Sequence, residues 1–385
     1  MRTKKHFSRF LISGQLHFAA HSHHPWPDVS FSAQQQAWLD AAALADRKWD
    51  KVFGDVLPAA QAHVARILHL PDPRSIAFAP NTHELFMRLW SCCPRDVPRV
   101  LTTDSEFHSF SRQMKRLEED GKAEVRRVSV APYASFEERF IAQARREHYD
   151  FVVFSQVFYD TGFRVLDLDA LVRAVSDSAT VVVIDGYHGY MAVPTDIGNI
   201  AQRAFYIAGG YKYAMAGEGA CFMHCPPGYA ERPPNTGWYA AFGTLARGQA
   251  ALQVPYAEGG QRFMGATFDP TALYRLNAVH EWMLRENLTV DAIHTHVENL
   301  QSRFLAQRAD RDLLKPGVML PPEGQPRGNF LVFRHPRAGQ WHRSLLDAGV
   351  VTDCRDDRLR IGFGLYHEPR DVDALANRIA GLRID

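Results

Sequence analysis

A lysine between two tyrosines has the surroundings in this chain that most favour covalent chemistry. Tyr211-Lys212-Tyr213 follows the apolar run Ala204–Ala208 and two glycines. A lysine at the end of a buried strand is costly to desolvate unless its amine is used. A desolvated lysine has a lowered pKa and forms Schiff bases with carbonyl compounds. A surface lysine whose stem lies along a turn is the alternative interpretation.

Two further groups of polar residues follow apolar runs. Asp185 comes directly after the four apolar residues at 181–184, and His188 follows three residues later. Asn81-Thr82-His83 stands between an expected strand and an expected helix, where free backbone N–H groups form an anion site. Ordinary helix capping is the alternative for both Asp185 and Asn81.

Together, these three groups predict one cofactor. A helix start suits a phosphate group, a carboxylate keeps a pyridine nitrogen protonated, and a lysine amine binds an aldehyde. Lys212 follows Asp185 by 27 residues. Pyridoxal 5'-phosphate requires all three groups, so we predict that the protein binds this cofactor.

The elements that must position these residues alternate between strands and helices. Runs such as VVVI are apolar on both faces, which is typical of a central parallel strand covered by helices on both sides. Repeated alternation predicts an α/β fold with a mainly parallel, doubly wound sheet, and ligands bind beyond the carboxyl ends of such strands. The expected strands are Ser75–Ala79, Arg99–Thr103, Glu124–Val128, Phe151–Phe154, Thr180–Ile184, Ala204–Ala208 and Ala220–His224.

We expect three parts along the chain. Residues 1–57 form an N-terminal segment with a helix over 33–52, which packs against the small domain or a partner, and residues 58–268 form the large cofactor-binding domain. Residues 226–268 are rich in Gly, Pro and aromatic residues, as in a functional loop. Residues 269–385 form a smaller α+β domain. Its expected elements are helices near 270–285 and 289–308, a strand at 329–333, a helix at 339–348, strands near 350–353 and 358–362, and a last helix from Glu368.

Composition excludes several classes of function. The 385 residues include 44 Lys and Arg and 43 Asp and Glu, for a formal net charge of +1. This balance provides no overall field for nucleic acid or an anionic membrane. No run approaches the ~20 apolar residues of a membrane span, and we expect a cytoplasmic protein. The five cysteines are scattered, which predicts neither a disulfide framework nor a metal site.

The motifs resemble those of the class-V aminotransferase superfamily of fold-type-I enzymes, and within it most of all kynureninase. The resemblance extends from about residue 17 to the end of the chain. Further motifs carry it: SQVFYDTGF (155–163), GWYAAFG (237–243), GGQRFMGAT (259–267) and GVVTDCRDDRLRIGFGLYHEPRDVDAL (349–375). It implies an amino-acid substrate and a homodimer with cofactor sites at the interface.

The resemblance also implies roles for individual residues. Lys212 would hold the cofactor aldehyde and later move the Cα proton, with Asp185 on the pyridinium nitrogen and His188 beside it. Arg360 would bind the substrate α-carboxylate with paired hydrogen bonds. The other implied cofactor contacts are Asn81, Thr82, His83, Phe107, Ser109, Tyr211, Trp238 and Thr267, the last from the partner subunit.

Departures from the family pattern surround the substrate. Kynureninases carry Asn-Ser-Leu-Gly where this chain has the sequence His-Ser-His-His-Pro-Trp at 21–26. We expect His21, Ser22 and His23 to contact the substrate there, and a merely polar loop is the alternative. Asp160 stands where the family often has arginine. Phe110-Ser111 stands where kynureninases have an aspartate, so Ser109 or Ser111 is expected to make that phosphate contact.

The expected activity is hydrolytic Cβ–Cγ cleavage of kynurenine or a related aryl amino acid, through an external aldimine and a quinonoid. A class-V aminotransferase with a keto-acid acceptor would use the same residues and stays open. A cysteine desulfurase is disfavoured because Cys354 falls in an expected strand rather than on a flexible loop. A catalytically silent binding protein of the same fold is disfavoured by the intact set of Asp185, Lys212 and Arg360.

Overall fold

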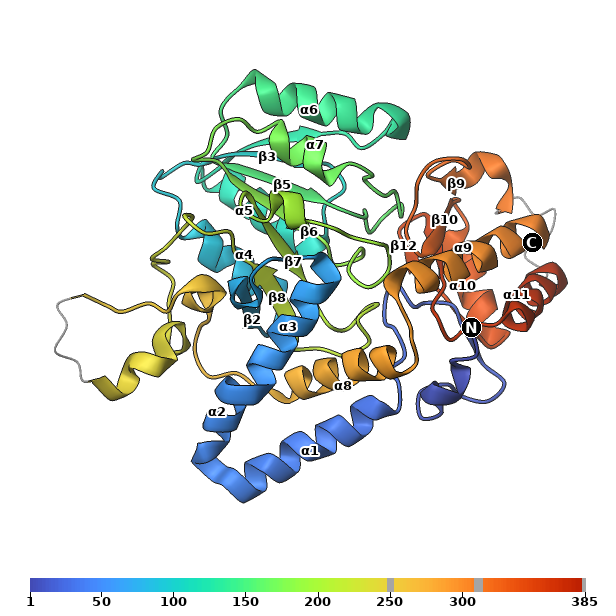
Figure 1. Ribbon diagram of the computed structural model, residues 1–385. Coiled ribbons are helices and arrows are strands. Elements are labelled where there is room, and N and C mark those ends of the chain that lie inside the picture. The colour runs from blue at the N-terminus through green and yellow to red at the C-terminus, as the bar shows by residue number, and fades with distance from the viewer. Residues whose placement is uncertain (248–252, 308–313, 383–385) are drawn as a thin grey trace.

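The centre of the protein is a seven-stranded sheet, seen in a computed structural model that describes residues 1–247, 253–307 and 314–382 (Figure 1). The strand order is β2-β8-β7-β6-β5-β3-β4, and only β8 runs antiparallel to its neighbours. The predicted α/β fold with a mainly parallel sheet is confirmed. The strands are β2 (Ile76–Ala79), β3 (Arg99–Thr103), β4 (Glu124–Val128), β5 (Phe151–Ser155), β6 (Val181–Asp185), β7 (Ala204–Ala208) and β8 (Cys221–His224).

Helices cover this sheet because its central strands are apolar on both faces. Every residue of β5 and β7 is buried, as expected for strands between two helical layers. Helices α4 (Thr82–Trp90) and α5 (His108–Glu119) begin close to where β2 and β3 end, which brings polar residues to the carboxyl edge of the sheet. The other helices between the strands are α6 (Phe136–Arg146) and α7 (Leu168–Arg173).

The N-terminal helix differs from the prediction. A single helix over 33–52 was expected, but α1 (Val29–Leu44) ends where Ala45 takes a φ of 49°. A left-handed residue cannot continue a right-handed helix, so the chain turns before α2 (Lys48–Lys51) and α3 (Leu57–Leu68). As a result α1 lies along α8 (Thr271–Arg285) on the outside of the molecule (Figure 1).

The C-terminal part forms a second, smaller sheet with its own hydrophobic cluster. Its order is β12-β13-β10-β9, and all of its pairs are antiparallel. The predicted helices and strands are present here. They are β9 (Met319–Leu320), β10 (Phe330–Arg334), β12 (Asp353–Arg355) and β13 (Arg358–Gly362), with α9 (Val290–Gln307), α10 (Ala338–Asp347) and α11 (Pro369–Gly381).

The N-terminal segment is joined to this smaller sheet region. β1 (Leu16–His17) pairs in parallel with β11 (Val350–Val351), and Phe18 lies in the smaller hydrophobic cluster. β1 is too short to show a period of two, so the sequence did not predict it, whereas β11 falls within the strand expected near 350–353. By contrast, α8 buries its apolar side in the larger cluster, although it follows residue 268. The chain therefore passes between the two cores more than once.

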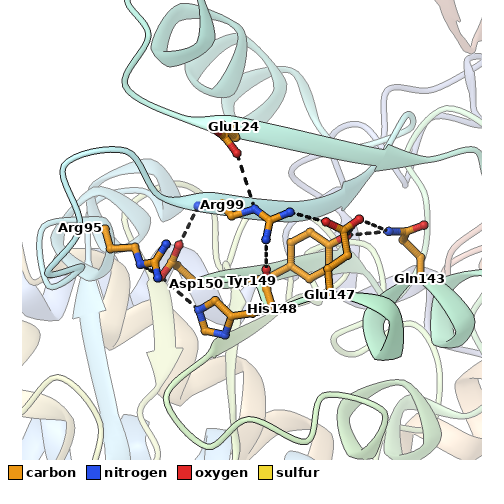
Figure 2. A network of polar contacts seen from close by, with 8 residues as sticks. All are labelled: Arg95, Arg99, Glu124, Gln143, Glu147, His148, Tyr149 and Asp150. Atoms are coloured by element: carbon orange, nitrogen blue, oxygen red, sulfur yellow. Dashed lines mark hydrogen bonds and ion pairs between the residues drawn. The ribbon is translucent and has the colours of Figure 1, made fainter.

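The two edges of the large sheet carry different residues. Because β3, β5, β6 and β7 are parallel, their carboxyl ends meet at one edge and their amino ends at the other. Arg99 and Asp150 lie at the amino ends of β3 and β5, in an ion network with neighbouring side chains (Figure 2). In the described ranges, no helix is long and apolar enough to cross a membrane.

Candidate active site

A cavity of about 260 Å³ lies at the carboxyl edge of the large sheet. Its walls come from the segments that follow β2, β3, β6 and β7. Segments far apart in sequence meet there because parallel strands end together. Nine of the predicted site residues line it, namely Asn81, Thr82, His83, Phe107, Ser109, Asp185, His188, Tyr211 and Lys212.

The amine of Lys212 is buried in the wall of this cavity. The side chain is 5% exposed, and Nζ lies 3.0 Å from His188 Nε2 and 3.2 Å from the carbonyl oxygen of His21. Burial, together with the positive charge of Arg360, lowers the pKa of Lys212 to about 7. The amine is therefore nucleophilic near neutral pH.

The turn before Lys212 needs glycine. After β7 the chain passes close to Tyr187, and a Cβ on Gly209 would lie 2.3 Å from the Tyr187 hydroxyl oxygen. This close approach brings the rings of Tyr187 and Tyr211 beside the amine, and Phe107 adds a third ring after β3, with centroids 5.1–5.6 Å from Nζ. The rings replace water, which is the physical origin of the lowered pKa of Lys212.

Asp185 ends β6 and lines the same cavity. Its Oδ1 accepts a hydrogen bond of 2.9 Å from the backbone N–H of Tyr187. Burial raises the pKa of Asp185 to about 6, and the Tyr187 N–H and the charge of Lys212 oppose this rise. Burial also holds the pKa of His188 well below its usual value, so this imidazole is neutral. The cavity thus combines an amine, a carboxylate and a neutral imidazole.

Helix α4 begins at the cavity wall. Asn81 is its N-cap residue, and the side-chain oxygen accepts a hydrogen bond of 2.9 Å from the backbone N–H of Glu84. Asn81 therefore caps the helix, and it also lines the cavity. The N–H groups of a first helical turn lack acceptors within the helix, which suits an anion beside Thr82 and His83.

Seven residues of the cavity wall were missed from the sequence, and so was Glu106, which lies behind the wall and bonds to the wall residue Ser155. Glu106 is 3% exposed, and its carboxylate accepts hydrogen bonds from Thr103 Oγ1 (2.7 Å) and from the side chain and backbone of Ser155. Burial raises the pKa of Glu106 to about 8. The search for carboxylates after strand ends that found Asp185 also applies to Glu106, which follows β3. The seven wall residues missed are Pro80, Ser155, Tyr159, Tyr187, Glu218, Gly219 and Cys221.

Other predicted residues lie outside the cavity wall. Arg360 is 3% exposed, and its guanidinium donates to Asp353 Oδ2 and to the carbonyl oxygen of Tyr159. Trp238 Nε1 donates to Thr267 Oγ1 over 3.2 Å, and the Trp238 side chain is 41% exposed. Trp238 and Thr267 therefore bond to each other and do not line the cavity.

The histidine-rich segment is divided between the interior and the surface. The His21 ring is fully buried and stacks on Phe330, while the His23 side chain is 44% exposed and lies 4.0 Å from Glu218. Ser22 lies between them, and its backbone N–H donates to the Ala19 carbonyl over 2.9 Å. In the described ranges, no group of three or more His, Cys, Asp or Glu side chains could hold a metal ion.

Comparison with known families agrees with this geometry. The family profile described as aminotransferase class-V matches residues 32–333. The chain belongs to the class-V aminotransferase family. A second profile, the kynureninase C-terminal domain, matches residues 293–379. The prediction of a pyridoxal-phosphate-dependent class-V enzyme is thereby confirmed at the level of the family.

Similar curated proteins fall into two groups. A kynureninase from Deinococcus radiodurans is 28% identical over 237 residues, which cover 60% of this chain and 56% of that protein. A kynureninase from Pseudomonas fluorescens is 27% identical over 228 residues, or 55% and 50% of the two chains. The chain thus spans about half the length of the kynureninases that it matches. An isopenicillin N epimerase from Streptomyces clavuligerus is 24% identical over 340 residues, 81% of each chain.

Solved structures share the whole fold at low identity. A variant of the cystine C-S lyase C-DES with glycine covalently linked to its PLP cofactor superimposes with a TM-score of 0.83, at 16% identity and 99% coverage of both chains. A cysteine desulfurase from Thermococcus onnurineus gives a TM-score of 0.81 at 15% identity, with 99% of this chain and 98% of that chain covered. At these identities the likeness supports the fold alone.

Proposed function

We propose that this protein is a pyridoxal-phosphate-dependent enzyme that cleaves the Cβ–Cγ bond of kynurenine or a related aryl amino acid by hydrolysis. The buried amine of Lys212, held 3.0 Å from His188 in a cavity that Asp185 also lines, carries the assignment of the cofactor. The match of residues 293–379 to the kynureninase C-terminal domain supports the choice of reaction.

The residues present suit the cofactor. One cavity is lined by an amine for the aldehyde, a carboxylate for the ring nitrogen, the Phe107 ring and the start of α4 for the phosphate. When bound, pyridoxal phosphate supplies an electron sink for the bonds at the substrate Cα. Asp185, whose pKa is raised to about 6 by burial, gains a favourable partner when a protonated nitrogen lies beside it.

Lys212 is then the group that moves protons. Lys212 would hold the cofactor aldehyde, and its ε-amine, when free, would be a base next to the substrate Cα. The low pKa of this buried amine, about 7, means that it both accepts and returns a proton near neutral pH. Neutral His188, 3.0 Å from Nζ, orients the amine, and the surrounding rings keep water away.

Arg360 is the proposed partner of the substrate α-carboxylate. Its guanidinium matches a carboxylate with two parallel hydrogen bonds. In this structure it already pairs with Asp353. The substrate α-carboxylate must therefore displace the Asp353 carboxylate from Arg360.

Transamination with a keto-acid acceptor is the second candidate. It would use the same Lys212, Asp185 and Arg360, and the departure from the kynureninase pattern at the buried His21 leaves it open. Cysteine desulfuration is not supported, because Cys354 lies in the three-residue strand β12 of a tight hairpin. A nucleophilic cysteine needs a mobile loop and a lowered pKa, but burial raises the pKa of the Cys354 thiol.

A homodimer is part of the proposal. Trp238 and Thr267 form an exposed pair outside the cavity, and α1 exposes Phe31, Trp38 and Leu39 on its outer side. Large exposed apolar side chains close together mark protein interfaces. A second copy would cover them, and light scattering of the purified protein measures the mass that decides this point. A cytoplasmic location remains part of the same proposal.

Incubation with kynurenine and 3-hydroxykynurenine tests the reaction. Hydrolysis releases alanine and an anthranilate without any added keto acid, and mass spectrometry measures both products. A requirement for a keto acid, with no alanine formed from kynurenine, would instead establish transamination. The Lys212→Ala variant is the control, because it removes the base and leaves the rest of the cavity in place.

A further inference from the structure

A buried cluster of three side chains lies directly behind the cavity wall. Arg360 on β13 donates to Asp353 Oδ2 on β12 and to the Tyr159 carbonyl. His21, from the N-terminal segment, places Nε2 3.6 Å from the same Asp353 oxygen. Arg360 is 3% exposed and His21 is fully buried. Two regions far apart in the sequence, the N-terminal segment and the β12–β13 hairpin, thus meet at one carboxylate.

His21 has polar atoms that the rest of the protein does not use. Neither ring nitrogen has a hydrogen-bond partner among the described residues, because 3.6 Å is too long for a hydrogen bond. The ring is nevertheless held firmly, since it stacks on Phe330 with centroids 4.6 Å apart and an interplanar angle of 18°. A buried ring nitrogen without a partner is unfavourable unless it gains one in another state.

His21 also touches the reactive amine. Its backbone carbonyl accepts a hydrogen bond of 3.2 Å from Lys212 Nζ. Burial and the positive charge of Arg360 lower the pKa of His21 to about 3, and Asp353 acts in the opposite direction. The other charged or titratable groups close to the ring are Lys212, His188 and, across Asp353, the half-exposed Arg355.

A substrate carboxylate would disturb this balance of charge. If it binds Arg360, it adds a negative charge to a dry region and separates Asp353 from its main partner. A partly buried carboxylate that loses its partner is strongly destabilised. Arg355 Nε stays 3.5 Å from Asp353 Oδ2, but the Arg355 side chain is half-exposed to water. His21 is buried beside the same carboxylate, and its ring becomes easier to protonate once the substrate neutralises Arg360.

We propose that Asp353 and His21 form a carboxylate-exchange pair. The α-carboxylate of the substrate takes Arg360 from Asp353, and His21 takes up one proton from solvent and pairs with the released Asp353. This inference rests on the role of Arg360 in the proposed function. It makes the site selective for amines that carry a carboxylate, because only these displace Asp353. His21 and Asp353 are positioning residues in this scheme.

Calorimetry of the cofactor-loaded enzyme with 3-phenylpropionate tests the exchange. This probe has an aryl group and a carboxylate but no amine, so it cannot react with the cofactor. Titrations at pH 7 in buffers of different ionisation enthalpy give the protons taken up per molecule bound. Visible absorbance measures any protonation at the lysine–cofactor bond, and this amount is subtracted from the total proton uptake. We expect close to one further proton for the wild type and close to none for His21→Gln.

Asp353→Asn gives a result of opposite sign. This variant keeps the shape of the side chain but leaves Arg360 without a resident carboxylate, so the probe should bind roughly tenfold more tightly or better, without the further proton. A residue with a purely structural role would weaken binding when changed. The unfolding midpoint of each variant shows that it is folded, and His21→Asn repeats the test if His21→Gln does not fold.

His148→Gln is the matched control. His148 Nε2 lies 3.5 Å from Asp150 Oδ1, nearly the same separation as in the His21–Asp353 pair, but at the opposite edge of the sheet. Its proton uptake should equal that of the wild type.

Unchanged uptake in His21→Gln, equal or weaker binding by Asp353→Asn, or no binding of the probe by the wild type would each overturn the exchange pair. Kynurenine cleavage is measured separately. Its absence beside normal proton uptake would overturn the proposed substrate and leave the exchange pair standing.

Discussion

The amino and carboxyl edges of the large sheet both carry charged side chains, but these side chains differ in their exposure to water and in how fully they are paired. At the amino edge, Arg99 contacts Glu147, Glu124 and the His148 carbonyl, while its backbone N–H donates to Asp150 (Figure 2). Arg99 and Glu147 are each about one-third exposed. The hydrogen bond from Arg99 lowers the pKa of Glu147, so both groups stay charged.

At the carboxyl edge the charged groups are removed from water without full pairing. Burial lowers the pKa of Lys212 and raises those of Asp185 and Glu106, so all three values approach neutrality. The carboxylate of Glu147 is a stable ion at one edge, whereas the carboxyl groups of Asp185 and Glu106 have pKa values near neutrality at the other. The difference teaches that access to water, rather than residue type, separates a structural network from a reactive site.

Among substitutions at the two edges, replacement of Lys212 should have the largest effect on activity. Lys212→Ala removes the amine proposed to hold the cofactor and to move the proton, so turnover should fall by about 10³-fold or more. The visible absorption of a lysine-bound cofactor should disappear while the unfolding midpoint stays close to that of the wild type. Absorbance, steady-state rates and thermal unfolding measure this. A variant that keeps the visible band would show that another group binds the cofactor.

Glu106→Gln tests whether burial behind the cavity raises the pKa of Glu106. The folded-state pKa of about 8 lies above the ordinary value of 4.5, so between these values the folded protein holds a proton that the unfolded chain has lost. Glu106 therefore destabilises the fold progressively as pH rises through this window. The free energy of unfolding of the variant, relative to the wild type, should rise by roughly 1–3 kcal/mol from pH 5 to 8.5.

Glu147→Gln is the matched control for that measurement. The folded-state pKa of Glu147 is lowered rather than raised, so its contribution is fully present above its unfolded-state pKa and is lost only as pH falls through the folded value. Its difference from the wild type should stay constant between pH 5 and 8.5. If the Glu106→Gln and wild-type stability curves run parallel over this range, the raised pKa of Glu106 is wrong.

Arg99→Ala should have the smallest effect. The variant breaks the amino-edge network, but its charges are exposed and screened by water, so the unfolding midpoint should fall by roughly 1–3 °C. The fall should shrink in about 1 M salt, and turnover should stay within about twofold of the wild type. A large loss of activity would show that the two edges are coupled.

Much of the fold and part of the site follow from local sequence patterns. Each predicted strand of the large sheet is present, and the small domain has its expected helices. Asp185 and Lys212 were found because an apolar run followed by a polar residue marks the end of a buried strand, and parallel strands end at one edge. These patterns act over a few residues, so a single sequence reveals them.

The tertiary structure alone decided which distant residues meet. The hydrogen bond from Lys212 to the His21 carbonyl joins residues 191 positions apart, and the approach of His21 to Asp353 brings the N-terminal segment to the hairpin of β12 and β13. No local pattern contains these contacts. The pKa values follow from the same packing, because the loss of water around Lys212 and Glu106 comes from side chains that only the folded chain brings together.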